Sequence, residues 1–328
     1  SDASIHAESV ATLPERWDAC LLGRGELDLT GVSVLSDSQV MWQTGGHLTR
    51  LALNTASHIT KAKTRKLGDM EIPQALSGLK GSLVYELPEK VLDIASLVEK
   101  LTAPHRARIR MGSVNSLSRE GKLSVSGLQI NAQVIICAAG LGNEELLIQL
   151  EAGAHLTQRR PLRQLMVKPM PFSLYGHGIT TSYKPRVTVT SHPLTSGGYV
   201  WYLGGAVADN TLSLTEEEAI TFAKKEMKEL FGHLDWSDKQ WATWYGFRAE
   251  AHTHDGRLPS GPIVQEYGKA LVIWPTKLTM APLLGDNVLS LLKDKGVVPK
   301  YSASSTQLHK MALPPLSPFP WDQAEWSK

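Results

Sequence analysis

The chain has 328 residues, of which 42% are hydrophobic and 20% are charged, as in globular proteins with a sizeable core. Its 34 basic and 32 acidic residues give a formal net charge of +2, so the charge offers no reason to expect nucleic acid or an acidic membrane as a partner. Two scattered cysteines, Cys20 and Cys137, exclude a disulfide framework and a structural zinc site, and we expect a reducing, cytoplasmic setting. The sequence contains no apolar stretch of about 18 residues and no signal-peptide pattern at its start.

Helical and strand patterns alternate along the first half of the chain. One helical pattern follows a candidate cap at Asp93, and another is closed by Gly153. Between them, short β-rich runs are separated by glycine or polar breaks, which is typical of short strands. The predicted helices are 8–22, 45–57, 93–101 and 143–153. The alternation over 31–42 predicts a strand pair, and further short strands are predicted within 106–137.

The second half begins with closely spaced, hairpin-like strand patterns, so we expect an antiparallel sheet. The clearest helix follows, with a Ser/Thr start, acidic residues in its first turn and Gly232 at its end. The Ser- and Pro-rich tail from about residue 302 is expected to hug the surface or to be loose. The predicted strands are 162–170, 178–183, 186–190, 197–209, 261–267 and 270–277, and the predicted helices are 213–232 and 278–296.

A glycine-containing turn follows the apolar run QVIICAAG and precedes a helix. The spacing of Gly140-Leu141-Gly142 falls one residue short of the dinucleotide-binding fingerprint, with Glu145 where the third glycine belongs. Ala139 and Gly140 would let a ligand approach the backbone, and the helix start would favour a phosphate. A plain strand–turn–helix explains the same residues. An NAD-dependent dehydrogenase is a weaker interpretation, because the turn lacks a βαβ context with an acid about 20 residues further on.

The segment TWYGFRAEAHTHDGRLPSG, residues 243–261, places Arg248 among three aromatic residues. Aromatic character predicts burial, and a guanidinium there could bind a substrate carboxylate between aromatic walls. The alternative is an arginine that only stacks or packs its stem at the surface. Asp255-Gly256 predicts a turn, after which Leu258-Pro259-Ser260-Gly261 would bring bare backbone near a flat ligand. The aromatic residues are Trp244, Tyr245 and Phe247.

A third motif, WPTKLTMAPLLGDNV, joins the last strand to the last helix. The strand is predicted to end at Trp274 and the helix to start near Thr279. The backbone N–H groups of residues 277–279 would then be free donors, and Lys277 would add a positive charge. Such a site suits a carbonyl that carries partial negative charge, although a capped helix with an exposed lysine explains the motif equally well.

Other polar clusters give weaker signals. His252 and His254 would face the same side of a strand, but no third ligand is in sight, so we expect no metal site. Arg159 and Arg160 are interpreted as a solvated pair. Spacing alone reveals no nucleophile elbow, P-loop or Ser-His-Asp arrangement.

Taken together and in this order, the motifs resemble the D-amino-acid oxidase/glycine oxidase family of FAD-dependent oxidoreductases. The family pattern has an apolar strand with Ala-x-Gly, a Pro-x-x-Gln segment, a Gly-(Phe/Leu)-Arg-Pro … Asp-Gly-x-Pro-x-x-Gly segment and a Gly/Thr-rich flavin loop before the last helix. These stand here as VIICAAG, RPLRQLMV, YGFRAEAHTHDGRLPSG and WPTKLTMAPLLG. The resemblance covers roughly residues 10–295.

The resemblance implies a role for each motif. Arg248 would bind the carboxylate of a small amino acid or 2-hydroxy acid, and Lys277 would stabilise the reduced flavin through its charge. Hydride would pass from the substrate α-carbon to the flavin of FAD. The residues implied to bind the cofactor are Val114, Ala139, Gly140, Gly261, Thr276, Lys277, Leu278 and Thr279.

Several positions depart from the family pattern. Ala249 stands where a proline is expected, Arg163 replaces a glycine before Gln164, and Pro275-Thr276-Lys277 replaces the glycines of the flavin loop. These departures suggest a divergent branch. The family also begins with a strand and Gly-x-Gly-x-x-Gly, which nothing before residue 30 supplies, so we expect a chain that lacks the N-terminal ADP-binding unit.

The order of the elements and the resemblance predict an α/β (α+β) fold, with an incomplete Rossmann-like FAD-binding domain and a substrate domain built on an antiparallel sheet. The leading hypothesis is a truncated FAD-dependent oxidoreductase of small amino or 2-hydroxy acids, whose activity as this chain alone is in question. The alternative is a flavin-free relative that binds a carboxylate or a protein. Exposed strand edges leave a homo-oligomer open. The FAD-binding-like domain is predicted from 1–17, 86–160 and 250–328, and the substrate domain from 18–85 and 161–249.

Overall fold

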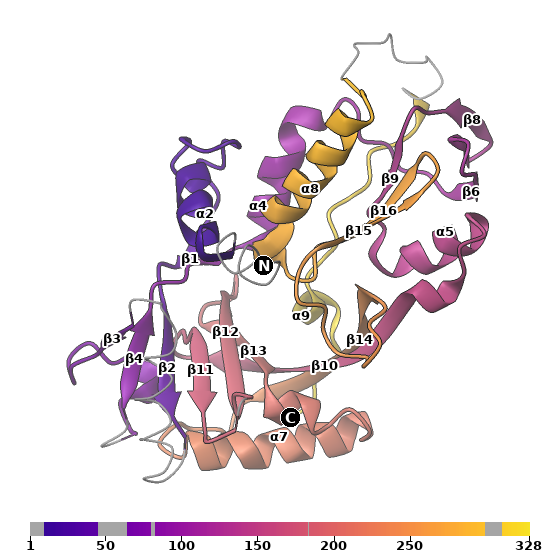
Figure 1. The fold of residues 1–328 in the computed structure, drawn as a ribbon. Coiled ribbons are helices and arrows are strands. Elements are labelled where there is room, and N and C mark those ends of the chain that lie inside the picture. Colours follow the sequence, from indigo (N-terminus) through magenta and orange to yellow (C-terminus); the bar gives the residue numbers. More distant parts are fainter. Residues whose placement is uncertain (1–9, 45–63, 80–82, 183, 299–309) are drawn as a thin grey trace. The chain divides into compact units, whose positions relative to one another are not determined.

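The computed structural model describes residues 10–44, 64–79, 83–182, 184–298 and 310–328, and the helix predicted over 45–57 lies outside them. The chain has a mixed α/β fold with several sheets, as predicted (Figure 1). It divides into two compact units, each built from separated stretches of sequence. The first unit contains Ser1–Gly31, Val98–Arg160 and Phe247–Leu316. The second unit contains Val32–Leu97, Pro161–Gly246 and Ser317–Lys328.

The first unit contains a three-stranded sheet between two helices. In that sheet β16 pairs in parallel with β9 and antiparallel with β15, so the carboxyl ends of β9 and β16 lie at one edge. The bounds of these strands are β9, Ile135–Cys137; β15, Ile263–Tyr267; and β16, Ala270–Trp274. The unit's helices are α2, Leu13–Leu21; α4, Ile94–Thr102, which begins in the second unit; α5, Asn143–Gln149; and α8, Ala281–Asp294.

The alternation of side chains along β16 explains why both faces of this sheet are covered. Successive strand residues point to opposite faces. Leu271 accordingly belongs to a core cluster with Leu284 and Val288 of α8. Val272 belongs to a different cluster, with Leu147 of α5. The sheet is therefore buried on both faces, and its strand ends are where a ligand can reach the backbone.

The β-rich run predicted over 106–137 forms a separate antiparallel meander before it enters β9. Its strands are β6, Val114–Leu117; β7, Lys122–Val125; and β8, Leu128–Asn131. Leu117 joins the core cluster of α5, which attaches the meander to the layered sheet.

The second unit is built on an eight-stranded sheet in the order β14-β10-β13-β12-β11-β2-β4-β3. The predicted antiparallel sheet is confirmed by β10, β11, β12 and β13, whereas residues 206–209 of the strand predicted over 197–209 form a short helix instead. Among the pairings of the described residues, β11 and β2 run parallel. Two of the boundaries between the units fall within the two longest strands, β10 and β14. The strands are β2, Gln39–Gln43; β3, Arg65–Lys66; β4, Val84–Leu87; β10, Thr157–Met170; β11, Gly176–Ile179; β12, Val187–Pro193; β13, Tyr199–Gly204; and β14, Gln240–Ala251.

The strand pair predicted over 31–42 is wrong, although both strands exist. β1, Val34–Ser36, pairs with β5, Val91–Leu92, whereas β2 pairs with β4 and β11. The Ser36 hydroxyl donates to the Ser38 carbonyl at 2.6 Å, which bends the chain between the two strands instead of forming a hairpin.

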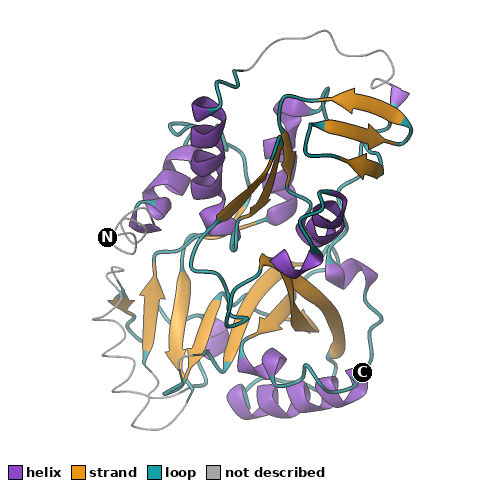
Figure 2. Ribbon diagram, turned by 45° about the vertical axis from the view of Figure 1, so that its right-hand side comes forward, coloured by secondary structure: helices purple, strands orange, loops and turns teal. Residues whose placement is uncertain are grey.

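Helix α7, Glu216–Leu230, covers one face of the eight-stranded sheet (Figure 2). The predicted Ser/Thr start is confirmed, because Thr215 and Glu218 form a reciprocal capping box. The core beneath the helix is rich in aromatic rings, and the ring of Phe231 lies 6.0 Å from that of Trp42 and 5.4 Å from that of Trp201. The described residues of this unit also include two short helices, α6, Ala206–Asp209, and α9, Pro320–Gln323.

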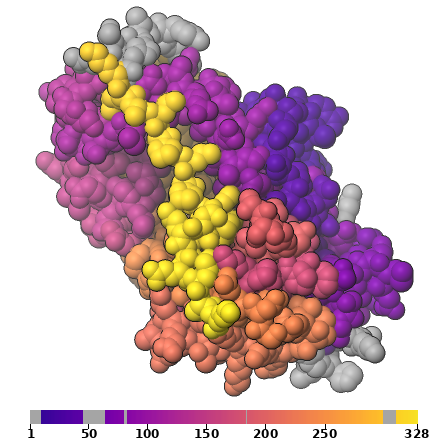
Figure 3. Space-filling view, turned by 180° about the vertical axis from the view of Figure 1, so that it is seen from behind, coloured from indigo at the N-terminus to yellow at the C-terminus, as the bar shows by residue number. Residues whose placement is uncertain are grey.

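The end of the chain packs on the surface of the second unit (Figure 3, yellow). The ring of Trp321 stacks on that of His192 at 4.2 Å and on that of Phe319 at 4.4 Å. Trp241 and Ser327 exchange two backbone hydrogen bonds, of 2.7 and 2.9 Å. The tail was predicted either to lie along the surface or to be loose, and residues 317–328 lie along the surface.

Candidate functional site

Two of the predicted cofactor segments lie side by side at the carboxyl edge of β9 and β16. Strand β9 leads into Ala139-Gly140, and its parallel neighbour β16 leads into Thr276. The buried side chain of Asn143 joins the two segments. Its Oδ1 accepts from the Ala139 amide at 3.0 Å, and its Nδ2 donates to the Ile273 carbonyl at 3.1 Å. Asn143 was not among the predicted site residues, because neither of its bonds is a helix cap and its Ile273 partner lies 130 residues further along the chain.

Gly261 is held at the same edge by Thr276. The Thr276 hydroxyl donates to the Gly261 carbonyl at 2.6 Å, and Thr276 adopts a left-handed backbone with φ of +69°. That conformation is costly for a β-branched residue and persists only where its surroundings enforce it. The segments after β9, before β15 and after β16 therefore meet at one place.

The predicted helix over 278–296 begins with a tight turn. A 3₁₀ helix spans Leu278–Met280, and α8 follows from Ala281. The Lys277 amide donates to the Pro275 carbonyl at 2.8 Å, so it is not one of the free donors that the sequence predicted. The amides of Leu278 and Thr279 lie in the first turn, where helical geometry supplies no acceptor. The side chain of Lys277 is exposed beside them.

The backbone after β9 is open to solvent, as a ligand-facing turn requires. Residues 138–142 are exposed, and Gly140 has φ of +58° with nothing within 4 Å of the position of an added Cβ. The prediction of a phosphate at the following helix is weakened, however. Helix α5 has seven residues and carries Glu144 and Glu145 in its first turn, which oppose a bound anion.

Arg248 lies half-buried on β14, two residues from the buried Glu250. Arg160 donates two hydrogen bonds to Glu250 from one edge of its guanidinium, from Nε at 3.0 Å and from Nη2 at 2.7 Å. Burial alone would raise the pKa of Glu250, but the hydrogen bonds from Arg160 and Gln158 and the charges of Arg160 and Arg248 lower it below its ordinary value. The interpretation of Arg160 as solvated is therefore wrong, because a buried carboxylate requires a partner.

The aromatic residues around Arg248 are not buried, which corrects the sequence-based prediction. The exposed fractions are 38% for Trp244, 44% for Tyr245 and 41% for Phe247. The reason is that β14 is an edge strand of its sheet. The guanidinium over the Tyr245 ring, at 5.5 Å, belongs to Arg163.

Arg163, one of the departures from the family pattern, has a structural role. It is 5% exposed and donates to the carbonyls of Thr215 at 3.0 Å and Leu214 at 2.9 Å, next to the start of α7. Val114 is the predicted site residue farthest from the others in topology. It lies on β6 in the meander, opposite Val125, and so belongs to a different sheet from β9 and β16.

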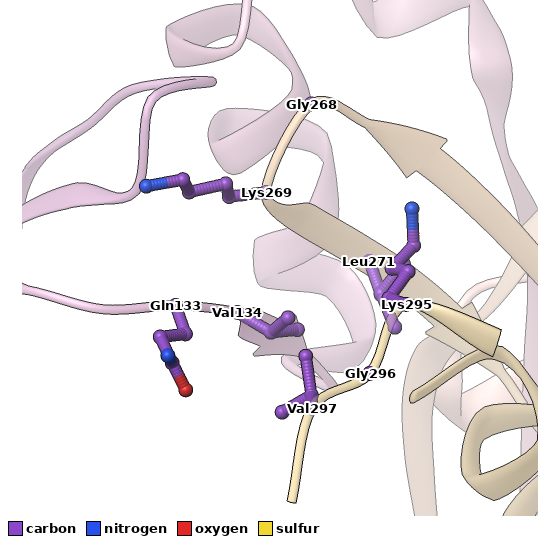
Figure 4. Close-up of a pocket in the computed structure, with 8 residues that line it drawn as sticks. All are labelled: Gln133, Val134, Gly268, Lys269, Leu271, Lys295, Gly296 and Val297. Atoms are coloured by element: carbon purple, nitrogen blue, oxygen red, sulfur yellow. The ribbon is translucent and has the colours of Figure 1, made fainter. Parts of the chain in front are cut away.

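Two further features do not form a site. A hollow of about 350 Å³ lies where β9 and β16 begin, opposite to the edge described above, and its polar side chains diverge (Figure 4). Lys295 there is paired with Glu266 at 2.5 Å.

His252 and His254 follow the end of β14 in a loop, and within the described ranges no three His, Cys, Asp or Glu residues are grouped to hold a metal ion. In the part of the chain that the structure describes, no helix combines the length and the apolar character that crossing a membrane requires.

The chain is similar to known flavoenzymes. No protein-family model matches it. The FAD-dependent oxidoreductase PA4991 of Pseudomonas aeruginosa is 37% identical over 326 residues, which cover 97% of this chain and 82% of that protein. Its crystal structure aligns with a TM-score of 0.83, over 97% of this chain and 83% of that one.

Two more distant structures share the fold. Glycine oxidase from Geobacillus kaustophilus is 14% identical with a TM-score of 0.54, over 93% of this chain and 81% of that one. Iminodiacetate oxidase from Chelativorans sp. BNC1 is 14% identical with a TM-score of 0.56, over 89% of this chain and 79% of that one. From the identity to PA4991 over nearly the whole chain, we conclude that this protein belongs to the same family of FAD-dependent oxidoreductases as PA4991.

Proposed function

We propose that this chain binds FAD at the carboxyl edge of β9 and β16 and oxidises a small amino acid or 2-hydroxy acid. The observation that carries the proposal is the pair of side-chain links at this edge. Asn143 joins the segments that follow β9 and β16, and Thr276 joins Gly261 to them. Three stretches distant in sequence are thereby held in one arrangement, as a preorganised ligand site requires.

The residues at this edge fit a flavin. Exposed backbone at Gly140 leaves room for close approach, because an added Cβ would meet nothing within 4 Å. Leu141 is 41% exposed and Leu278 is 48% exposed, so the edge offers apolar side chains to a flat ring. The exposed Lys277 and the first amides of the 3₁₀ turn would stabilise negative charge on a ring carbonyl.

Arg248 is the residue that we propose for the substrate. Its planar guanidinium can bind a carboxylate through two parallel hydrogen bonds, which fixes orientation as well as position. When bound, FAD would supply the hydride acceptor. Relatives named glycine oxidase and iminodiacetate oxidase support a small acid as the substrate class. Membership of a flavoenzyme family does not favour the flavin-free alternative.

The test is a visible absorption spectrum of the purified 328-residue chain with and without added FAD, followed by a panel of small amino and 2-hydroxy acids. We expect flavin bands that stay with the protein through gel filtration and are bleached by at least one acid. A colourless chain that ignores added FAD would contradict the cofactor proposal.

The role of Arg248 needs its own comparison. Arg248→Ala should abolish bleaching at substrate concentrations that serve the unmodified chain, while retaining the flavin. Arg159→Ala is a matched control, since Arg159 pairs with Glu144 at 2.6 Å on a half-exposed surface. Equal bleaching by both variants would remove Arg248 from the proposed site.

A further inference from the structure

A buried carboxylate beside Arg248 organises part of the proposed site. Glu250 is 2% exposed and has three hydrogen-bond donors on its two oxygens. Arg160 contributes two of these bonds, and Gln158 contributes the third through Nε2 at 3.1 Å. A charge at this depth is stable only while such bonds persist, so Glu250 fixes β14 to β10 at this point.

Gln158 extends the network from Glu250 to the turn that follows β14. Its Nε2 also donates to the Arg257 carbonyl at 2.8 Å, and its Oε1 accepts from the Thr253 amide at 3.0 Å. The Thr253 hydroxyl donates to the same Arg257 carbonyl at 2.7 Å. One side chain thus closes both ends of the turn over 253–257, whose tip is Gly256 with φ of +66°.

This turn leads directly to the proposed flavin edge. Four residues after Arg257, the chain reaches Gly261, which Thr276 holds at 2.6 Å. Arg248 lies on the same strand as Glu250, two residues earlier, and alternate strand residues point to the same side. Glu250 therefore stands between the residue proposed for the substrate and the segment proposed for the cofactor.

We infer that Glu250 is a positioning residue that, through Arg160 and Gln158, fixes both Arg248 and the 253–261 segment in register with the flavin edge. The inference rests on the proposed function for the identity of the ligands, but the network itself is independent of them. An amide at position 250 keeps the shape of the side chain while losing its charge and one acceptor oxygen. Glu250→Gln would weaken the hydrogen bonds that hold Gln158 and Arg160 in place, and it would remove the charge interaction between position 250 and Arg248.

The experiment compares Glu250→Gln with the control variant Glu266→Gln. Glu266 is also an ion-paired glutamate, but its pair with Lys295 is half-exposed. The first measurement is amide hydrogen exchange in the 328-residue chain without ligand. We expect Glu250→Gln to speed exchange over 253–261 on the order of tenfold, while Glu266→Gln leaves that segment unchanged. Thermal unfolding of both variants establishes that each is folded at the temperature of the measurement.

The second measurement is made on the chain loaded with FAD. Glu250→Gln should raise the KM for the acid substrate more than it lowers kcat, with a loss of kcat/KM of about tenfold to a hundredfold. It should also weaken FAD binding, measured by quenching of flavin fluorescence. Gln158→Leu, which cuts the link to the turn but spares Arg160, should weaken FAD binding more than it raises KM.

The outcomes separate this inference from the proposed function. Unchanged exchange over 253–261 in Glu250→Gln would overturn the inference whether or not the chain oxidises acids. Faster exchange in a chain that binds no flavin and oxidises no acid would refute the proposed function and leave the network intact. If Gln158→Leu and Glu250→Gln raise KM equally and neither affects flavin binding, the proposed link to the 253–261 segment fails.

Discussion

The hydroxyl of Thr276 donates a hydrogen bond of 2.6 Å to the backbone carbonyl of Gly261, and Thr276 itself has a φ of +69°. A left-handed backbone costs a β-branched residue on the order of 1–3 kcal/mol, which the hydrogen bond offsets in part. The contact holds together the loop after β16 and the loop before β15, both proposed to face the flavin.

Replacing Thr276 tests this contact directly. Thr276→Val keeps the branched shape and the strained backbone but removes the donor, so we expect a loss of about 1–2 kcal/mol in the free energy of unfolding. Thr276→Ser retains the hydroxyl and should stay within about 0.5 kcal/mol of the unmodified protein. Urea denaturation monitored by tryptophan fluorescence checks both values, and equal stability of the two variants would show that the bond is not needed.

Asn143 should be the more sensitive link at this edge. It is fully buried, and Asn143→Ala leaves the Ala139 amide and the Ile273 carbonyl without their partner. We expect a loss of roughly 1–3 kcal/mol, since an unsatisfied buried group at the Ile273 carbonyl costs about that much, whereas solvent can reach the exposed Ala139 segment. Asn131→Ala, at an exposed position on β8, is the control and should change stability by less than about 0.5 kcal/mol. The measurement is the same urea titration, and similar losses in both variants would contradict the assigned role.

Arginine geometry at position 248 predicts that lysine is a poor substitute. Arg248→Lys keeps the positive charge but loses the two-pronged hydrogen bond to a carboxylate. The KM for the acid substrate should rise about tenfold to a hundredfold, which corresponds to one or two charge-assisted hydrogen bonds. Steady-state kinetics on the chain loaded with FAD provide the measurement. A KM unchanged by lysine would mean that charge alone suffices, and a two-pronged contact would be excluded.

His192 predicts a pH dependence of stability in the second unit. It is 9% exposed beneath Trp321, and burial lowers its pKa to about 4, with a small opposing effect from Asp93. An unfolded histidine has a pKa of about 6.5, so the unfolded state binds the extra proton between these values. The stability that the neutral, buried His192 side chain allows is therefore fully present above a pH of about 6.5. The free energy of unfolding then decreases as the pH falls toward about 4. The decrease is on the order of 3 kcal/mol.

The measurement for His192 is the free energy of unfolding from pH 4 to pH 7, values chosen to bracket the window of about 4 to 6.5. His192→Gln should flatten the profile in this window, whereas His105→Gln, at an exposed position, should leave it unchanged. A profile that is equally steep in His192→Gln would assign the dependence to other groups.

Local patterns in the sequence were sufficient for most of the elements. The cap at Asp93 was legible because capping is local, and Asp93 indeed accepts from the Ser96 amide at 2.7 Å. The same holds for the capping box that starts α7. The failure at residues 31–42 has the opposite cause: which strands pair is decided by partners far along the chain.

The sequence by itself determined the residue types and the order of the motifs, and these sufficed to indicate the flavoenzyme family, because motif order survives where individual residues change. Only the tertiary structure decided which residues meet. Asn143 and Glu250 gave no signal in sequence, because their bonds reach Ile273, Gln158 and Arg160 across 90 residues or more of chain. The exposure of Trp244, Tyr245 and Phe247 was likewise decided by the edge position of β14, since hydrophobic character cannot reveal whether a strand has one neighbour or two.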